Sequence, residues 1–86
     1  MCQMDQIAAC EIAFIPIGTA EYLEPIEEVL ELIKQSGLAY DIGAMTTFIR
    51  GHYTDILKLV ENIYQTLNTT TKFSMEIKLS NLCGCD

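Results

Sequence analysis

The sequence contains no tryptophan, two prolines and one histidine, and it is poor in basic residues. Five lysines and arginines stand against twelve acidic residues, which gives a net charge of −7. Binding to phosphate backbones and to anionic lipid surfaces depends on clustered lysine and arginine. We therefore expect neither nucleic acid nor a membrane as a partner, and the field of the protein attracts cations instead.

Signals for export and for membrane insertion are also missing. The first residues, MCQMD, lack a basic start followed by a long apolar stretch, so we predict a cytoplasmic protein. The longest apolar run, residues 12–17, contains a proline and is far too short to cross a bilayer. In a reducing compartment, the cysteines at positions 2, 10, 83 and 85 are expected to remain thiols.

The patterns of common catalytic sites are absent as well. The chain has no P-loop, no dinucleotide-binding glycine motif and no recognisable set of nucleophile, histidine and acid. The single histidine, His52, stands at the start of a predicted helix, where it is suited to cap the helix or lie on the surface. We predict a binding protein that is not an enzyme and that needs no cofactor.

The sequence does contain six segments with a clear apolar period. Alternating residues indicate strands, and the segment at residues 7–17 is apolar on both sides, as is typical of a central strand. Apolar stripes with helical spacing indicate two helices. The predicted strands are residues 7–17, 38–42, 45–50 and 72–80, with a hairpin at Gly43-Ala44, and the predicted helices are residues 21–35 and about 53–68.

This order of elements, β-α-β-β-α-β, predicts an α+β, ferredoxin-like sandwich. Right-handed crossovers then give an antiparallel sheet of strand order 4-1-3-2, with both helices on one face. The length of 86 residues fits one domain covering residues 1–86. The opposite face of the sheet is half apolar, so we expect it to find a partner, such as a second copy in a homodimer or tetramer.

Several segments, taken in order, point to a known family. Residues 10–19 (CEIAFIPIGT) form an apolar strand that ends in proline and a turn, residues 36–40 (SGLAY) lead from a helix into a strand, and residues 45–51 (MTTFIRG) close a hairpin on glycine. In sequence and spacing they resemble the YkoF-like thiamine/hydroxymethylpyrimidine-binding proteins. The resemblance implies reversible, non-catalytic binding of thiamine or its hydroxymethylpyrimidine part. Because some members carry two such domains in tandem, it also implies a homo-oligomer here.

The resemblance makes Thr47 the first candidate for contact with this ligand. Its hydroxyl would bond the edge of an aminopyrimidine, and the alternative is a bond to a neighbouring backbone group. Tyr22 and Tyr40 are candidates for stacking on a flat ring or on a thiazolium cation. Tyr22 also lies on the apolar stripe of its predicted helix, so it has a second interpretation as core.

Three further residues complete the predicted site. The carboxylates of Glu11 and Asp41 could hold the amino group or protonated edge of a pyrimidine, with a solvated surface position as the alternative. Met45 is a candidate for the wall of the pocket, and its alternative is a place in the core, as for Phe14.

Two other functions fit the same sequence. The first is a ligand-free oligomerisation or regulatory module that pairs through the bare face of the sheet. The second is a thiol or metal-binding protein, because the topology brings Cys2, Cys83 and Cys85 to one end of the sheet. The metal interpretation is the weaker, since Cys-x-Cys alone is not a specific motif. Cys10 is expected to be a buried, small apolar residue.

Overall fold

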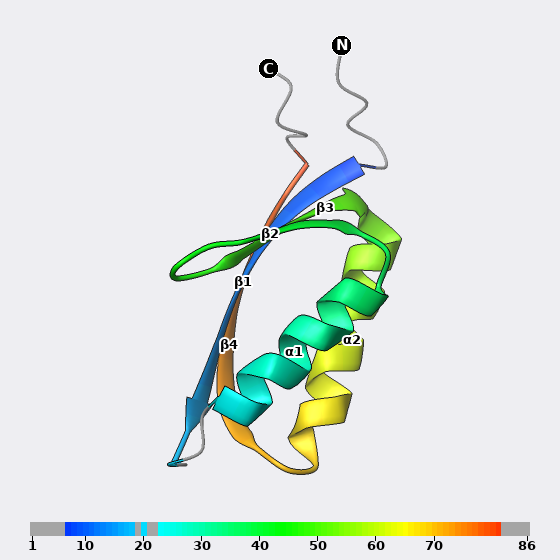
Figure 1. Cartoon of the computed structure of the whole chain (residues 1–86). Coiled ribbons are helices and arrows are strands. Elements are labelled where there is room, and N and C mark those ends of the chain that lie inside the picture. The colour runs from blue at the N-terminus through cyan, green and yellow to red at the C-terminus, as the bar shows by residue number, and fades with distance from the viewer. Residues whose placement is uncertain (1–6, 19, 21–22, 82–86) are drawn as a thin grey trace.

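The chain folds into four strands and two helices in the predicted order. A computed structural model describes residues 7–18, 20 and 23–81. The strands form one antiparallel sheet of order β2-β3-β1-β4, and both helices cover the same face of it (Figure 1). The α+β, ferredoxin-like fold and the strand order are thus confirmed. The elements are β1 (Ile7–Ile17), α1 (Leu23–Gln35), β2 (Ala39–Ile42), β3 (Thr47–His52), α2 (Tyr53–Asn68) and β4 (Lys72–Ser80).

The strand β1 lies in the middle of the sheet, as its two apolar sides predicted. It pairs with β3 on one side and with β4 on the other, so that Ile12 stands opposite both Thr47 and Ile77. Because side chains alternate along a strand, the even-numbered residues of β1 point to the helices. Ala8, Cys10 and Ile12 are accordingly buried, and the odd-numbered residues occupy the face without helices.

The core lies between this strand and one apolar stripe of each helix. Val29 and Ile33 of α1 share it with the stripe of α2, and Ile49 of β3 joins them from the sheet. The stripe of α2 consists of Ile56, Leu59, Ile63 and Leu67. Neither helix that the structure describes is long and apolar enough to span a membrane.

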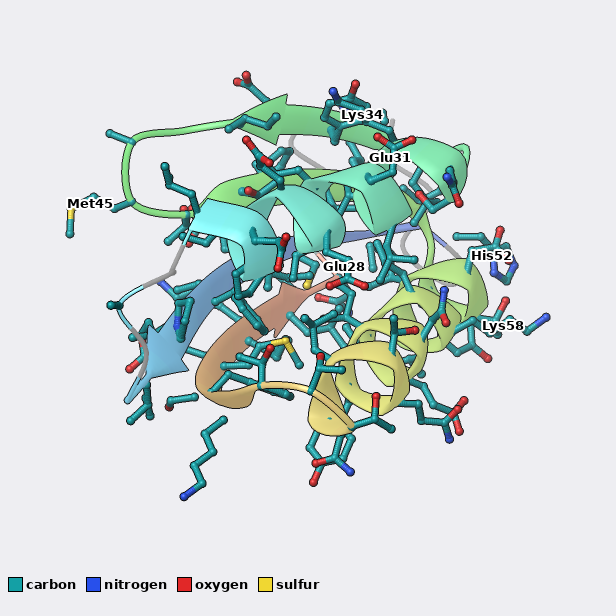
Figure 2. The ribbon with its side chains drawn as sticks, turned by 60° about the horizontal axis from the view of Figure 1, so that its bottom comes forward. Glu28, Glu31, Lys34, Met45, His52 and Lys58 are labelled. Carbon is teal, nitrogen blue, oxygen red and sulfur yellow. The ribbon has the colours of Figure 1, made fainter. Side chains whose placement is uncertain are left out.

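Local hydrogen bonds fix the ends of the helices. The Nδ1 atom of His52 accepts a hydrogen bond from the backbone N–H of Thr54 at 3.3 Å, which caps α2 (Figure 2). At the end of α1, the hydroxyl of Ser36 donates to the carbonyl of Ile33 at 2.6 Å. Gly37 follows with a φ of +80°, a conformation that glycine adopts without steric cost. The single histidine is thus occupied as a cap.

The hairpin differs from the prediction in its bounds: β2 begins at Ala39 and not at residue 38, and β3 ends at His52 and not at residue 50. The second strand was expected to begin at residue 45, but β3 begins at Thr47. The backbone N–H of Gly43 donates to the carbonyl of Thr46 at 2.9 Å, which leaves Ala44 and Met45 as the loop. Met45 is therefore 88% exposed, and its interpretation as a core residue is wrong. The predicted start of the first helix, residues 21 and 22, lies outside the described residues.

Candidate functional site

A hollow of about 190 Å³ lies between α1, β1 and the hairpin that joins β2 to β3. The loop of this hairpin projects beyond the helices (Figure 1). One wall is apolar and is built by Ile12, Phe14, Ile26, Val29, Leu30 and Ile33. The opposite rim is formed by residues 42–47 of the hairpin. In Figure 2, Met45 extends from the tip of this hairpin, away from the rest of the chain.

Thr47 is the one buried polar residue in the part of the chain that the structure describes, with 9% of its surface exposed. It lines the hollow from the start of β3. Its hydroxyl makes no hydrogen bond to any described residue, although its alternative interpretation required one to the backbone. Every described polar side-chain atom that is sealed from solvent has a hydrogen-bonding partner. Because the Thr47 hydroxyl has no such partner, it must be accessible to solvent. A ligand in the hollow can therefore reach it.

The other predicted site residues do not all gather around this hollow. Tyr40 points to the helix side of β2, opposite Ile49, but it does not line the hollow and is 42% exposed. Glu11 and Asp41 both stand opposite Phe48, so they lie on the face of the sheet that carries no helix. Tyr22 lies outside the described residues. Of the six candidates, the structure brings Met45 and Thr47 together at one hollow.

The bare face of the sheet has a shallow hollow of its own. Glu11 stands between Phe48 of β3 and Lys78 of β4, and Glu76 lies next to this pair. The hollow is lined by Glu11, Ala13, Thr46, Glu76, Ile77 and Lys78. A ligand there would meet two carboxylates and one ammonium group in an open setting, where water screens charge.

Sequence reasoning missed part of the main hollow. Ile26 and Leu30 fall on the apolar stripe of α1, which indicated core, and nothing in their spacing distinguishes a core side chain from a pocket wall. The backbone of Gly43 and Thr46 closes the hairpin rim. A signal was present here in Gly43: a Cβ at this position would lie 2.8 Å from the carbonyl oxygen of Thr46, so the close approach at this rim requires glycine.

Of the four cysteines on which the thiol and metal hypotheses depend, Cys10 lies within the described residues. Cys10 is 1% exposed, as expected for a small apolar residue, and burial together with the nearby charge of Glu11 raises the pKa of its thiol. No cluster of three or more metal-binding side chains occurs within residues 7–18, 20 and 23–81. Cys2, Cys83 and Cys85 lie outside this range, so the metal site at Cys83 and Cys85 stays a prediction.

The described residues thus combine a ferredoxin-like fold with a hollow of about 190 Å³ beside its hairpin. The sequence pattern of the thiamine-binding protein family matches residues 10–82, and the chain therefore belongs to this family. No curated protein matches the chain.

Solved structures with the same fold come from several organisms. A candidate thiamine biosynthesis or salvage protein of Thermotoga maritima is 20% identical, with a TM-score of 0.80 over 86% of this chain and 82% of its own. A domain of unknown function from Bacillus cereus is 21% identical, with a TM-score of 0.78 over 98% and 84%. A hypothetical protein of Methanocaldococcus jannaschii is 25% identical, with a TM-score of 0.77 over 87% and 79%. At such identities, these structures establish the shared fold.

Proposed function

We propose that this protein binds thiamine, or its hydroxymethylpyrimidine part, reversibly and without catalysis, in the hollow between α1 and the hairpin. The observation that carries the proposal is Thr47, a buried residue that lines an apolar hollow and whose accessible hydroxyl has no described hydrogen-bonding partner. Small-molecule sites typically combine apolar walls with a few such polar groups. Membership of the thiamine-binding family supports the choice of ligand, and the proposal places this binding in the cytoplasm.

The size of the hollow indicates which part of thiamine would enter it. A cavity of roughly 150 Å³ accommodates benzene, so about 190 Å³ suits one substituted six-membered ring. We place the aminopyrimidine inside, with an edge bonded to Thr47. The thiazolium ring would then lie at the rim near Met45, a residue that is 88% exposed and whose thioether is suited to contact with an aromatic ring. The net charge of −7 favours the approach of this cation.

The Thr47→Val variant tests the proposal, because it removes the hydroxyl and keeps the shape of the side chain. One lost hydrogen bond is worth about 0.5–1.5 kcal/mol, so we expect thiamine to bind roughly 2- to 13-fold more weakly. Isothermal titration calorimetry measures the dissociation constant. Thermal denaturation without ligand should show little change, because the hydroxyl has no described bond to lose.

Thr47→Ser is the matched control, since it keeps the hydroxyl and should retain more of the affinity than the valine variant. The proposal fails if the wild-type protein shows neither heat nor a thermal shift at millimolar thiamine, because a bound ligand stabilises the folded state. It also fails if the valine variant binds as tightly as wild type. A large loss of stability in Thr47→Val would show instead that the hydroxyl is structural.

A ligand-free oligomerisation module is the second candidate function. The observation in its favour is the exposure of Ile15, Ile17 and Phe48 on the bare face of the sheet, at 46%, 50% and 40%. Exposed apolar groups of this kind mark interaction surfaces. This function predicts a stable oligomer that Phe48→Asp dissociates and that thiamine does not stabilise. Light scattering and thermal shift measurements distinguish the two candidates.

A further inference from the structure

The hollow beside the hairpin is lined by uncharged residues. Its described lining consists of apolar side chains, two threonines and Gly43, with no charged side chain among them. Proteins bind phosphate groups mainly through lysine and arginine side chains and through backbone N–H groups at the start of a helix. An anion that is taken from water without such partners loses hydration that nothing replaces. The charges around the hollow therefore decide which form of a ligand it accepts.

The basic residues of the chain lie elsewhere in the fold. All five lysine and arginine side chains belong to described residues, and none of them lines this hollow. Arg50, Lys72 and Lys78 stand opposite odd-numbered residues of β1, so they lie on the bare face of the sheet. Lys58 lines a groove between the two helices, together with Leu32 of α1. Four of the five are thus separated from the hollow by the sheet or by α1.

Lys34 is the basic residue closest to the hollow along the chain. It stands in the last turn of α1, one turn beyond Leu30 of the apolar wall. That turn leads through Gly37 into the start of β2, whereas the hollow lies by the hairpin loop beyond the end of β2. Figure 2 shows Lys34 well apart from Met45 at the tip of the hairpin. No described basic side chain therefore belongs to the rim near Met45.

Acidic residues, by contrast, flank the hollow on α1. This helix carries four glutamates and one lysine in its 13 residues. Glu27 is exposed, directly follows Ile26 and lies one turn before Leu30, and both of these neighbours line the hollow. The start of the helix has Glu24 in its first turn and Pro25, which has no N–H to donate to an anion. A negative group at this rim would therefore meet negative charge.

We propose that the hollow selects the unphosphorylated ligand and discriminates by charge against its phosphate esters. The inference rests on the proposed function and names the form of the ligand. A phosphate is attached to thiamine through the hydroxyethyl arm of the thiazolium ring, and to the pyrimidine alone through its hydroxymethyl group. With the pyrimidine ring inside the hollow, either phosphate would lie at the rim, on the acidic side of α1. The free alcohols bring no negative charge, and thiamine brings a positive one.

A comparison of thiamine with thiamine monophosphate gives the first test. Isothermal titration calorimetry at low ionic strength should show that the ester binds about fivefold more weakly, because like charges at the rim repel it. The difference should shrink as salt is added, since salt screens exposed charges. Hydroxymethylpyrimidine and its phosphate should show the same order of affinity.

Reversal of one charge on α1 gives the second test. The measured quantity is the ratio of the dissociation constant of the ester to that of thiamine. In Glu27→Lys, a basic side chain stands beside the hollow, so this ratio should fall about threefold. Glu61→Lys is the matched control, because it makes the same change in net charge on the exposed surface of α2, which contributes no described residue to the hollow. The ratio should remain near its wild-type value there.

A lysine at the tip of the hairpin gives a third test that leaves α1 unchanged. Met45→Lys should also lower the ratio about threefold, because its ammonium group can approach a phosphate at the rim. Met45→Gln has a side chain of similar length without the charge, so it separates the effect of charge from the loss of the thioether. Met45 is 88% exposed, and thermal denaturation should show that both variants are folded.

The inference alone is overturned if the wild-type protein binds the ester as tightly as thiamine at low ionic strength. It is also overturned if neither salt nor the lysine variants change the ratio, because shape and not charge would then exclude the ester. Equal effects of Glu27→Lys and Glu61→Lys would assign the discrimination to the net charge of the whole protein and contradict a role of the rim. If neither thiamine nor its ester binds, the proposed function fails as well.

Discussion

Replacement of Ile63 by alanine is expected to lower the free energy of unfolding by about 2–5 kcal/mol. Ile63 is fully buried in α2 and belongs to the cluster that joins both helices to the sheet. Alanine removes three carbon atoms and leaves a cavity that neighbours fixed in an antiparallel sheet fill only in part. In a domain of this size, each 1 kcal/mol shifts the melting temperature by roughly 4–8 °C. Urea denaturation followed by circular dichroism measures the loss.

Leu23→Ala is the control for Ile63→Ala. It also removes three carbon atoms from a helical side chain, but Leu23 is 61% exposed at the start of α1. Substitutions at such surface positions usually change stability by no more than about 0.5 kcal/mol. Equal losses in the two variants would contradict the placement of Ile63 in the core and of Leu23 at the surface.

The sequence predicted those elements whose pattern is local. The bounds predicted for α2, residues 53–68, agree with the structure because an apolar stripe runs through the helix and polar residues follow it. The predicted bounds of β4, residues 72–80, also agree, since its side chains alternate strictly. The start of β3 was misplaced by two residues. A hairpin loop with no glycine at its centre gives little local signal, and one hydrogen bond between Gly43 and Thr46 sets the register.

The candidate site was less accessible to sequence reasoning because it is a tertiary feature. The helix-side position of Thr47 was predicted, since alternation alone places its hydroxyl on that side of its strand. Glu11 and Asp41 were grouped with it by chemical type, although their sheet positions put them on the opposite face. Whether Ile26 and Leu30 fill the core or line a hollow depends on how far the hairpin extends beyond α1, which no local pattern encodes.

The β4 edge illustrates the same difference between pattern and context. Alternation showed that Ile77 and Leu79 share the side of Phe73 and Met75. It did not show that helix cover declines along the strand, leaving Phe73 and Met75 half-buried and Ile77 and Leu79 exposed. That gradient depends on the path of α2 across the sheet, and so the apolar surface became visible only in three dimensions.

Cys10 is expected to resist thiol reagents until the protein unfolds. In a Cys2→Ser/Cys83→Ser/Cys85→Ser variant, Cys10 is the only thiol, and alkylation of the native state should be at least roughly 100-fold slower than in urea. The side chain is 1% exposed, and burial with the charge of Glu11 raises the pKa of its thiol, so both access and the reactive thiolate are limited. Mass spectrometry over time measures the rates.

The same raised pKa makes stability depend on alkaline pH. The folded state favours the neutral thiol of Cys10. The contribution of this preference to the free energy of unfolding is fully present below the thiol pKa of the unfolded chain and is lost as pH rises above about 9. In the triple-serine background, the Cys10→Ala variant has no thiol to ionise, so its free energy of unfolding should not fall for this reason at alkaline pH. Its core packing is weaker than that of the cysteine form at every pH. The two chains should therefore differ most near neutrality and converge at high pH. Parallel curves, or rapid labelling of the native state, would contradict a buried, protonated Cys10.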